Sequence, residues 1–490
     1  MMRFIRPFGA SLLSIVLACV AIAAEPATGQ QTSRPNIVFI LTDDLAPWAL
    51  GVAGNRDAKT PNLDRLFRDG AYLVNAFTVT PVCSPSRAAL MASRYGSELG
   101  ITDFLNDGIE RELGLDPSLP TWPKILAASG YTTGLVGKWH LGSLDKYHPT
   151  QLGYGYFMGF RGGGTSPKNP MLEVEGKRQE VKGFTSDILT DAAIEFIRRN
   201  PAGPFAISLH YRSPHEPWTP IADEDAAPFK DLDPAIPNPN YPNLDIPRVK
   251  DMTRRYLASV HEVDRNVGRL RQAIEELKLA EKTVIIFTSD HGYNMGHNGI
   301  WHKGNGHWIV TKPPPATENI PKNQRPNMYD NSLRVPTAVC WPGVIRPGTI
   351  VENVVANIDW FPTLVAIGGA EIPKDAKIRG RSFLPLLKGE KIAWDDTFYG
   401  EYSTHHQSHT HMRTARTPRW KLVRDFLNDG RDELYDLEKD PAETTNLIAR
   451  SNSEIKQVVA ELDAKILAHM KENGDAVLDE LRKRDHGSPQ

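Results

Sequence analysis

The sequence predicts an α/β fold in which a mostly parallel sheet is covered by helices on both faces. Short apolar runs that end in polar residues alternate with segments of helical periodicity, as in strands joined by crossover helices. The runs are also nearly continuous in apolar residues, which is typical of parallel strands buried on both faces. The strands predicted in this way are 36–41, 133–136, 204–209, 283–287 and 337–341.

Two helices are predicted from their start signals and their apolar faces. Thr60 and Pro61 open the first, which ends at Gly70 and carries Leu63 and Leu66 on one face. The second helix is long, and its apolar residues recur at spacings of three and four positions. These residues are Tyr256, Val260, Val263, Val267, Leu270, Ile274 and Leu277.

The size and charge of the chain limit the classes of protein to which it can belong. With 490 residues, of which 40% are hydrophobic, the chain exceeds what one hydrophobic core usually serves. The net charge of -2 argues against an overall electrostatic grip on nucleic acid or on an anionic membrane. We predict a large catalytic domain at 32–390 and a smaller α+β domain at 391–490. The smaller domain is expected to contain a small antiparallel sheet, with strands at 419–424 and 433–436, and a charged terminal helix that begins near Ser453.

The N-terminal segment is typical of a secretory signal peptide. Residues 1–24 combine Arg3 and Arg6 with an apolar run that ends in small residues and is too short for a membrane span. Only Cys83 and Cys340 remain after cleavage, so the exported chain has no disulfide framework. No Asn-x-Ser/Thr sequon is present, which favours a bacterial source and a periplasmic or secreted protein. No integral membrane span is predicted.

Chemically versatile residues follow four of the predicted strands. The carboxyl ends of parallel strands lie at one edge of a sheet, so these residues should converge. Any one aspartate after a strand is more often a turn or a helix cap, but their joint occurrence at one edge indicates a site. They are Asp43 and Asp44 after the first strand, Lys138 and His140 after the second, His215 after the third, and Asp290 and His291 after the fourth.

The carboxylates in this set suit a metal ion. Asp43, Asp44 and Asp290 offer hard oxygen ligands for a divalent cation, and His291 or a nearby side-chain oxygen can complete the shell. The sequence therefore predicts a metal centre that binds an anion.

The remaining residues suit a tetrahedral oxyanion and proton transfer. Arg87, Lys138 and Lys303 supply positive charge. Residue 83 is expected to open a helix, whose dipole adds to the same field. The side chains of His140 and His215 can carry protons near neutral pH.

Taken in order, eight segments resemble those of the type I, formylglycine-dependent sulfatases of the alkaline phosphatase superfamily. They cover nearly the whole mature chain. They are NIVFILTDD at 36–44, TPNLD at 60–64, CSPSR at 83–87, GKWHLG at 137–142, SPHEP at 213–217, FTSDHG at 287–292, LRVP at 333–336 and ELYDLEKDP at 433–441. The CSPSR segment matches the pattern in which maturing enzymes oxidise cysteine to formylglycine. Alone, it is as consistent with a small residue at a helix start.

The resemblance implies a metal centre and a set of catalytic roles. The metal ligands implied are Asp43, Asp44, Asp290, His291 and an oxygen of the modified Cys83. The ion implied is Ca²⁺, with Mg²⁺ or Mn²⁺ left open by the nitrogen ligand. In the implied catalytic roles, Arg87 holds the formylglycine, His140 hydrogen-bonds its hydrate, Lys138 binds sulfate, and His215 and Lys303 face the leaving oxygen. His297 and His307 are close enough in sequence to compete with Lys303.

The activity implied is hydrolysis of a sulfate ester, of a sulfated carbohydrate in particular, with release of inorganic sulfate. The implied partners are a sulfated glycan or small molecule and a formylglycine-generating maturase. Two alternatives are a formylglycine-dependent phosphonate monoester or phosphodiester hydrolase, and a non-catalytic binder of sulfated glycans. The oligomeric state is not predicted.

A histidine-rich segment at 405–411 allows two interpretations. Its four histidines could form a second metal site, but a polar loop of this kind more often faces solvent or substrate. We favour the loop.

Overall fold

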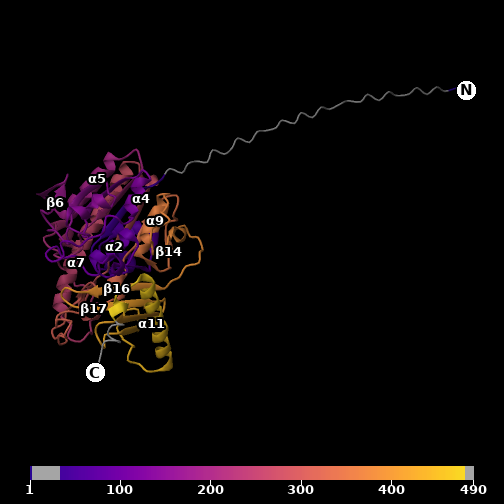
Figure 1. The fold of residues 1–490 in the computed structure, drawn as a ribbon. Helices are drawn as coiled ribbons and strands as arrows, with labels where there is room; N and C mark the ends of the chain where they lie inside the picture. The colour runs from indigo at the N-terminus through magenta and orange to yellow at the C-terminus, as the bar shows by residue number, and fades with distance from the viewer. Residues whose placement is uncertain (3–33, 481–490) are drawn as a thin grey trace. The chain divides into compact units, whose positions relative to one another are not determined.

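The computed structural model describes residues 1–2 and 34–480 (Figure 1). The predicted signal peptide at 1–24 lies outside the described residues apart from Met1 and Met2. Across the described part of the chain, no helix has both the length and the apolar character that a membrane crossing requires.

A ten-stranded sheet organises the chain. Its strands lie in the order β14-β2-β13-β9-β1-β8-β4-β5-β6-β7. The central strands pair in parallel, and the predicted α/β fold with a mostly parallel sheet is confirmed. In spatial order these parallel strands are β9 (Thr283–Ser289), β1 (Asn36–Thr42), β8 (Phe205–His210), β4 (Thr132–Lys138) and β5 (Tyr156–Phe160).

Shorter strands extend the sheet on both sides. The last predicted strand forms as β13 (Ala338–Cys340), which runs antiparallel to β9. Beyond it lie β2 (Ala71–Leu73) and β14 (Thr349–Val351). At the opposite edge, β6 (Met171–Val174) and β7 (Lys177–Glu180) form an antiparallel hairpin.

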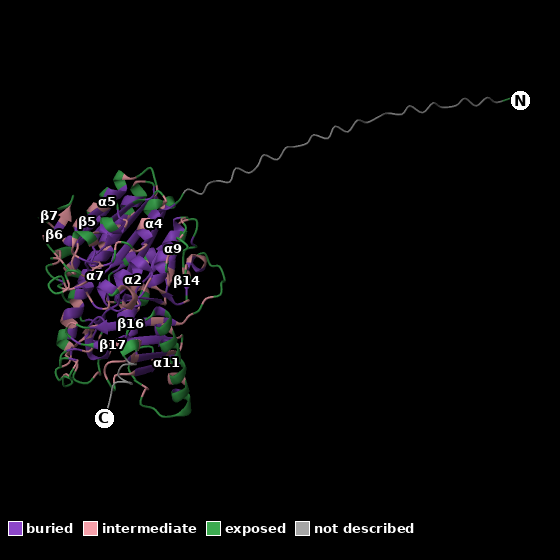
Figure 2. Ribbon diagram, in the orientation of Figure 1, coloured by how far each residue is buried: buried purple, intermediate pink, exposed green. Residues whose placement is uncertain are grey.

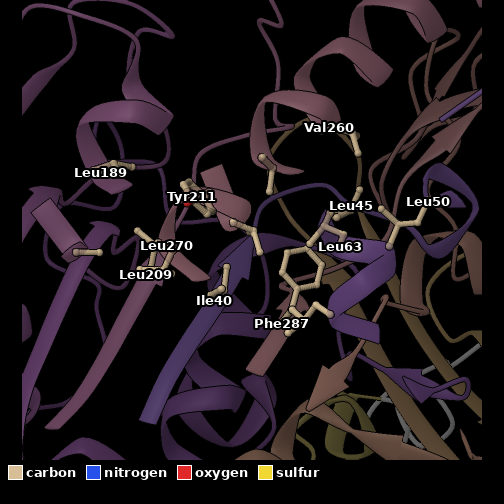
Figure 3. Close-up of a cluster of buried hydrophobic side chains, with 14 of the residues drawn as sticks. Ile40, Leu45, Leu50, Leu63, Leu189, Leu209, Tyr211, Val260, Leu270 and Phe287 are labelled. Carbon is tan, nitrogen blue, oxygen red and sulfur yellow. The ribbon is translucent and has the colours of Figure 1, made fainter. Parts of the chain in front are cut away.

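The sheet is buried on both faces because alternate residues of each strand point in opposite directions. In β1, Val38 and Ile40 pack into one apolar cluster, and Ile37 and Phe39 pack into the other. Helices α1 (Pro61–Asp69), α5 (Thr185–Arg199) and α7 (Ile246–Glu276) contribute to the first cluster, part of which Figure 3 shows. Helices α2 (Cys83–Ala92), α4 (Trp122–Ala128) and α9 (Trp360–Ile367) contribute to the second.

Both predicted helices are present, and one is longer than expected. α1 runs from Pro61 to Asp69, as its sequence signals indicate. α7 begins at Ile246, well before the first residue of the predicted stripe, because the Asp245 side chain caps it by accepting from Arg248 N. Its whole apolar stripe is buried except for Leu277, and burial of each aliphatic side chain contributes about 1.5–3 kcal/mol.

The C-terminal part contains the predicted antiparallel sheet and terminal helix (Figure 1). Its strands are β16 (Phe398–Thr404), β17 (Thr410–Arg416), β18 (Trp420–Asp425) and β19 (Glu433–Asp436), followed by α11 (Ser453–Asn473). The α+β character of this part is confirmed. The domain boundaries at 390 and 391 stay a prediction.

A buried ion cluster ties the C-terminal sheet to the segment that precedes it. Lys421 on β18 is fully buried, and its Nζ lies 2.8 Å from Asp330 Oδ1 and 2.6 Å from Glu443 Oε1. Asp330 begins the short helix α8 (Asp330–Leu333) and also accepts from Arg416 Nε at 3.0 Å. Two buried carboxylates therefore depend on one lysine and one arginine.

Lys421→Met should lower the free energy of unfolding by about 3–5 kcal/mol, because it leaves buried carboxylates without their partner. Urea unfolding and the melting temperature measure the effect. Lys439→Met is the matched control, because the Lys439 side chain is 76% exposed and pairs with Asp436 only at 3.6 Å. Its cost should stay within about 1 kcal/mol. Equal losses in the two variants would contradict the role of the buried cluster.

Candidate active site

The parallel pairing of β1 with β9 brings four of the predicted site residues together. Thr42 at the end of β1 lies opposite Ser289 at the end of β9, and Asp290 N donates to Thr42 O at 3.0 Å. Asp43, the first residue after β1, therefore lies beside Asp290. All three aspartates and His291 are buried.

The other predicted residues arrive from β4, β8, α2 and a loop. Lys138 is the last residue of β4, Cys83 is the first residue of α2, and Lys303 follows β11 (Ile300–His302). His215 lies in the segment after β8, and its Nε2 is 3.9 Å from Asp44 Oδ2. The structure thus gathers all the predicted positions at the carboxyl ends of the parallel strands.

One group of side chains could hold a metal ion. His291 Nε2 is 3.4 Å from both Asp44 Oδ1 and Asp290 Oδ1, and 3.9 Å from Asp43 Oδ1. Ligand atoms of Asp43, Cys83, Asp290 and His291 all lie within 4.8 Å of one another.

Unpaired buried atoms support the fit of a cation at this point. Asp43 Oδ1, Asp44 Oδ2 and His291 Nε2 have no hydrogen-bond partner although they are buried. Burial raises the pKa of Asp44 to about 7 against the opposing effect of Lys303, and burial with the charge of Asp43 raises the pKa of Asp290. A divalent cation would relieve this crowding of negative charge, and the oxygen-rich donor set suits a hard ion.

The predicted cations are paired with these carboxylates. Lys138 Nζ contacts Asp43 Oδ2 at 2.5 Å, and Lys303 Nζ contacts Asp44 Oδ1 at 2.7 Å. Arg87 Nε donates to Asp290 Oδ2 at 2.9 Å, and its Nη1 donates to the carbonyl of Lys138 at 3.1 Å. Burial raises the pKa of Asp43, but Lys138 and the other nearby cations outweigh it and hold that pKa well below its usual range.

Cys83 lies at the meeting point of these charges. Its side chain is buried at the start of α2, and its Sγ is 3.6 Å from Lys303 Nζ. Burial disfavours a thiolate, yet Lys138 and Lys303, together with the neighbouring imidazoles of His140 and His291, lower the pKa of Cys83 well below its usual value. Residue 83 is therefore set in a field that stabilises negative charge.

The competing histidines lie apart from this centre. His297 packs against Trp48, and burial lowers its pKa to about 4. His307 packs on Trp301. Among the three, Lys303 is the one that contacts Cys83.

Sequence analysis missed two supports of the site. His210, the last residue of β8, donates from Nδ1 to Lys138 O at 3.0 Å, and the same nitrogen lies 3.5 Å from Arg87 Nη1. It directly follows the apolar run PFAISL at 204–209, so its position after a predicted strand was the available signal. Its carbonyl also lies where a Cβ on Gly137 would be (1.9 Å), which requires glycine there.

The second missed support is the loop at 103–110. Leu105 O lies 3.0 Å from His140 Nε2, and Leu105 N donates to Ser84 Oγ at 2.9 Å. These contacts fix His140 relative to the helix that carries Cys83. The loop has no motif that would have indicated this role.

Both cysteines of the described chain are free. Cys340 is buried on β13, where its Sγ lies 3.6 Å from Asp69 O, and burial raises its pKa. These two cysteines are therefore not joined to each other, and Cys340 is a small side chain of the buried core.

Two family models match the chain. The model described as "Sulfatase" matches residues 35–370, and the model described as "N-sulphoglucosamine sulphohydrolase, C-terminal" matches residues 323–472. Together they span most of the described residues.

Individual sulfatases are also similar to this chain over most of its length. An N-acetylglucosamine-6-O-sulfatase of Bacteroides thetaiotaomicron is 26% identical over 528 residues, with coverage of 91% of this chain and 88% of the relative. The steryl-sulfatase of Mus musculus is 26% identical over 584 residues, with coverage of 95% and 86%. A solved structure in complex with its substrate D-glucosamine-2-N,6-O-disulfate has a TM-score of 0.77 at 24% identity and covers 90% of this chain and 99% of that one, a likeness of fold.

Asp290→Asn should reduce the bound divalent metal while leaving the fold intact. The change keeps the shape of the side chain but removes one charge from the cation site, and loss of affinity should reach at least about 10–100-fold. Elemental analysis of the purified protein, beside a thermal melt, measures both quantities.

Asp264→Asn is the matched control, because Asp264 is a buried carboxylate that accepts from Leu63 N and Asn62 Nδ2, outside the candidate site. It should keep the metal. Normal metal content in Asp290→Asn would remove Asp290 from the ligand set.

Proposed function

The chain belongs to the sulfatase family, and we propose that it removes sulfate from carbohydrate sulfate esters by means of a formylglycine generated from Cys83. As a member of this family it is a sulfuric ester hydrolase. The observation that carries the proposed mechanism is the position of Cys83, the first residue of α2, beside the Asp43, Asp290 and His291 cluster and 3.6 Å from Lys303 Nζ.

A carbohydrate substrate suits the surroundings of the centre. The relative from Bacteroides thetaiotaomicron is an N-acetylglucosamine-6-O-sulfatase. Partly exposed side chains beside the centre are polar, with His215 at 21% and Glu216 at 41% exposure. Such groups can pair with sugar hydroxyls, whereas a sterol ester would call for a broad apolar wall.

The residue at position 83 would supply the nucleophile. An aldehyde hydrate there offers one hydroxyl that displaces the alcohol from sulfur and a second whose collapse releases inorganic sulfate. Arg87 orients this end of α2 through Asp290 and the Lys138 carbonyl. His140 lies within hydrogen-bonding reach of the side chain at position 83.

Positive charge would stabilise the sulfuryl oxygens. Lys303 Nζ bridges Asp44 Oδ1 and Cys83 Sγ, so it faces atoms attached to residue 83. Lys138 lies on the other side against Asp43. The N-terminus of α2 adds to the same field, because its partial charge is positive.

Two residues are placed to hand a proton to the leaving oxygen. His215 Nδ1 donates to Glu216 O at 2.6 Å, which leaves Nε2 as the atom turned to the centre. Lys303 Nζ is the other donor. The dependence of turnover on the leaving group distinguishes the two donors.

The proposed metal ligands are Asp43, Asp44, Asp290, His291 and an oxygen of the converted residue 83. Ca²⁺ suits the oxygen-rich set best, and the imidazole leaves Mg²⁺ or Mn²⁺ as alternatives. Bound there, a divalent cation would withdraw charge from the sulfuryl group. The comparisons give no support to the phosphonate or phosphodiester alternative. Parallel assays on aryl sulfate and aryl phosphonate would reveal it.

The proposed setting is the bacterial cell envelope or exterior. The N-terminal sequence, the absence of sequons and the bacterial carbohydrate relative support export to the periplasm or medium. A formylglycine-generating maturase is the partner that the mechanism requires.

Cys83 should be converted to formylglycine when the chain is produced together with a maturase. Peptide mass spectrometry should show the loss of mass that accompanies conversion of a thiol to an aldehyde at residue 83. Cys340, observed in the same digest, should keep its thiol and serves as the internal control. Fully active protein with an intact Cys83 thiol would refute the proposed nucleophile.

His215→Ala should lower turnover of a sugar sulfate much more than turnover of nitrophenyl sulfate, if His215 is the acid. A sugar alkoxide is a poor leaving group and needs a proton, whereas nitrophenolate leaves without help. Turnover of the sugar sulfate should therefore fall by roughly 10²-fold or more. The ratio of kcat/KM on the two substrates is the measurement.

Lys303→Ala, assayed beside it, decides which residue carries the proton, because only one of them should show the leaving-group dependence. His307→Ala is the control, since His307 is close to Lys303 in the sequence but packs on Trp301, apart from the centre. Equal losses on both substrates would make the tested residue a sulfate-binding group instead.

A further inference from the structure

The histidine-rich segment divides into two parts in the structure. His405 and His406 follow β16 and turn toward Glu110, which lies 295 positions from His405 in the sequence. His411 instead contacts Ser403 Oγ and Glu480, and the His409 residue is exposed. A cluster of one carboxylate and two imidazoles thus forms outside the residues proposed for catalysis.

The ligand atoms of this cluster converge. His405 Nε2 lies 2.7 Å from Glu110 Oε1, and His406 Nε2 lies 3.1 Å from Glu110 Oε2. His406 Nε2 also lies 2.9 Å from the carbonyl oxygen of Phe104. Ligand atoms of Glu110, His405 and His406 all lie within 4.8 Å of one another, the Phe104 carbonyl adjoins His406, and the side chain of His406 is only 8% exposed.

A simple ion pair accounts poorly for this arrangement. The rings of His405 and His406 have centroids 4.5 Å apart, so two imidazolium charges would repel each other across that distance. One carboxylate would then have to serve both. A metal ion instead uses both imidazoles in their neutral form and retains the carboxylate as an anionic ligand.

The spacing of the atoms is close to that of a zinc site. Ligand atoms about 2.0–2.2 Å from a tetrahedral Zn²⁺ lie roughly 3.3 Å from one another. To reach that value, the contact of Glu110 with His405 (2.7 Å) needs to lengthen by about 0.6 Å and its contact with His406 (3.1 Å) by about 0.2 Å. Rotation of side chains on partly exposed loops is enough for this adjustment.

We infer that Glu110, His405 and His406 form a second metal site of the zinc class, with the Phe104 carbonyl or a water as fourth ligand. The two nitrogen ligands favour Zn²⁺ over Ca²⁺, whereas the carboxylate-rich centre at Asp43 favours a hard ion. The two sites are thus chemically distinct.

The position of the site gives it a consequence for the proposed active centre. It joins the end of β16 to the loop at 103–110, whose Leu105 contacts both Ser84 and His140. Asp103 reinforces the junction, because its Oδ2 accepts from His405 N and its Oδ1 accepts from Phe104 N. Metal binding would fix this loop, and with it the orientation of His140, without touching the substrate.

Zinc titration of demetallated mature protein in saturating Ca²⁺, against a competing chromophoric chelator, tests the inference. Wild-type protein should bind about one Zn²⁺ more per chain than His406→Ala or Glu110→Gln. Glu110→Gln keeps the size and acceptor oxygen of the side chain but loses its charge, so it separates metal binding from packing. His409→Ala lies on the same loop and should bind zinc as the wild type does.

A thermal melt and Co²⁺ substitution provide readouts independent of activity. Zn²⁺ should raise the melting temperature of the wild type and of His409→Ala, because it binds the folded state, and should leave Glu110→Gln unchanged. Co²⁺ should give visible ligand-field absorption that His406→Ala loses. Equal zinc binding by wild type, His406→Ala and Glu110→Gln would overturn the inference. If His406→Ala lost stability but bound zinc as the wild type does, the cluster would be a purely hydrogen-bonded contact. Failure of sulfate ester hydrolysis would not affect these results.

Discussion

The parallel pairing of β1 with β9 forces three carboxylates into one buried space, and the centre of the molecule depends on how their charge is balanced. Asp43, Asp44 and Asp290 are almost completely buried. Two unit charges about 4 Å apart repel by roughly 4 kcal/mol at an effective dielectric constant of 20. This cost makes the cations next to the carboxylates part of the fold as well as part of the site.

Cations on neighbouring elements of the fold balance these negative charges. β4 ends at Lys138, which meets Asp43, and α2 turns Arg87 back onto Asp290. Lys303 reaches Asp44 from a loop. Each anion thus has a cation supplied by another element, so the order of the strands and the charge balance of the centre specify each other. Asp43 Oδ1, Asp44 Oδ2 and His291 Nε2, which have no hydrogen-bond partner, mark where an additional positive charge fits.

The parts of this architecture that follow local rules could be predicted from the sequence. Continuous apolar runs identified four of the five parallel strands, all but β5, and the rule that parallel strands end at a common edge placed Asp43, Lys138 and Asp290 near one another. Contacts between distant segments could not be predicted. Glu110 and His405 are 295 positions apart, and although His405 lies in the histidine-rich segment, nothing in the sequence pairs it with Glu110. The start of α7 was missed because its cap, Asp245, follows a proline-rich stretch that masks the helical pattern.

Burial of α2 determines whether Cys83 can be modified before or after folding. All ten of its residues are buried, including the whole Cys83 to Arg87 segment (Figure 2). An enzyme that recognises these side chains in sequence needs them extended and accessible, and the packed helix offers neither. The oxidation that our mechanism requires must therefore come before α2 docks on the sheet. Synthesis, modification and folding must then occur in that order. A chain that folds before modification would be a stable protein that lacks formylglycine at position 83.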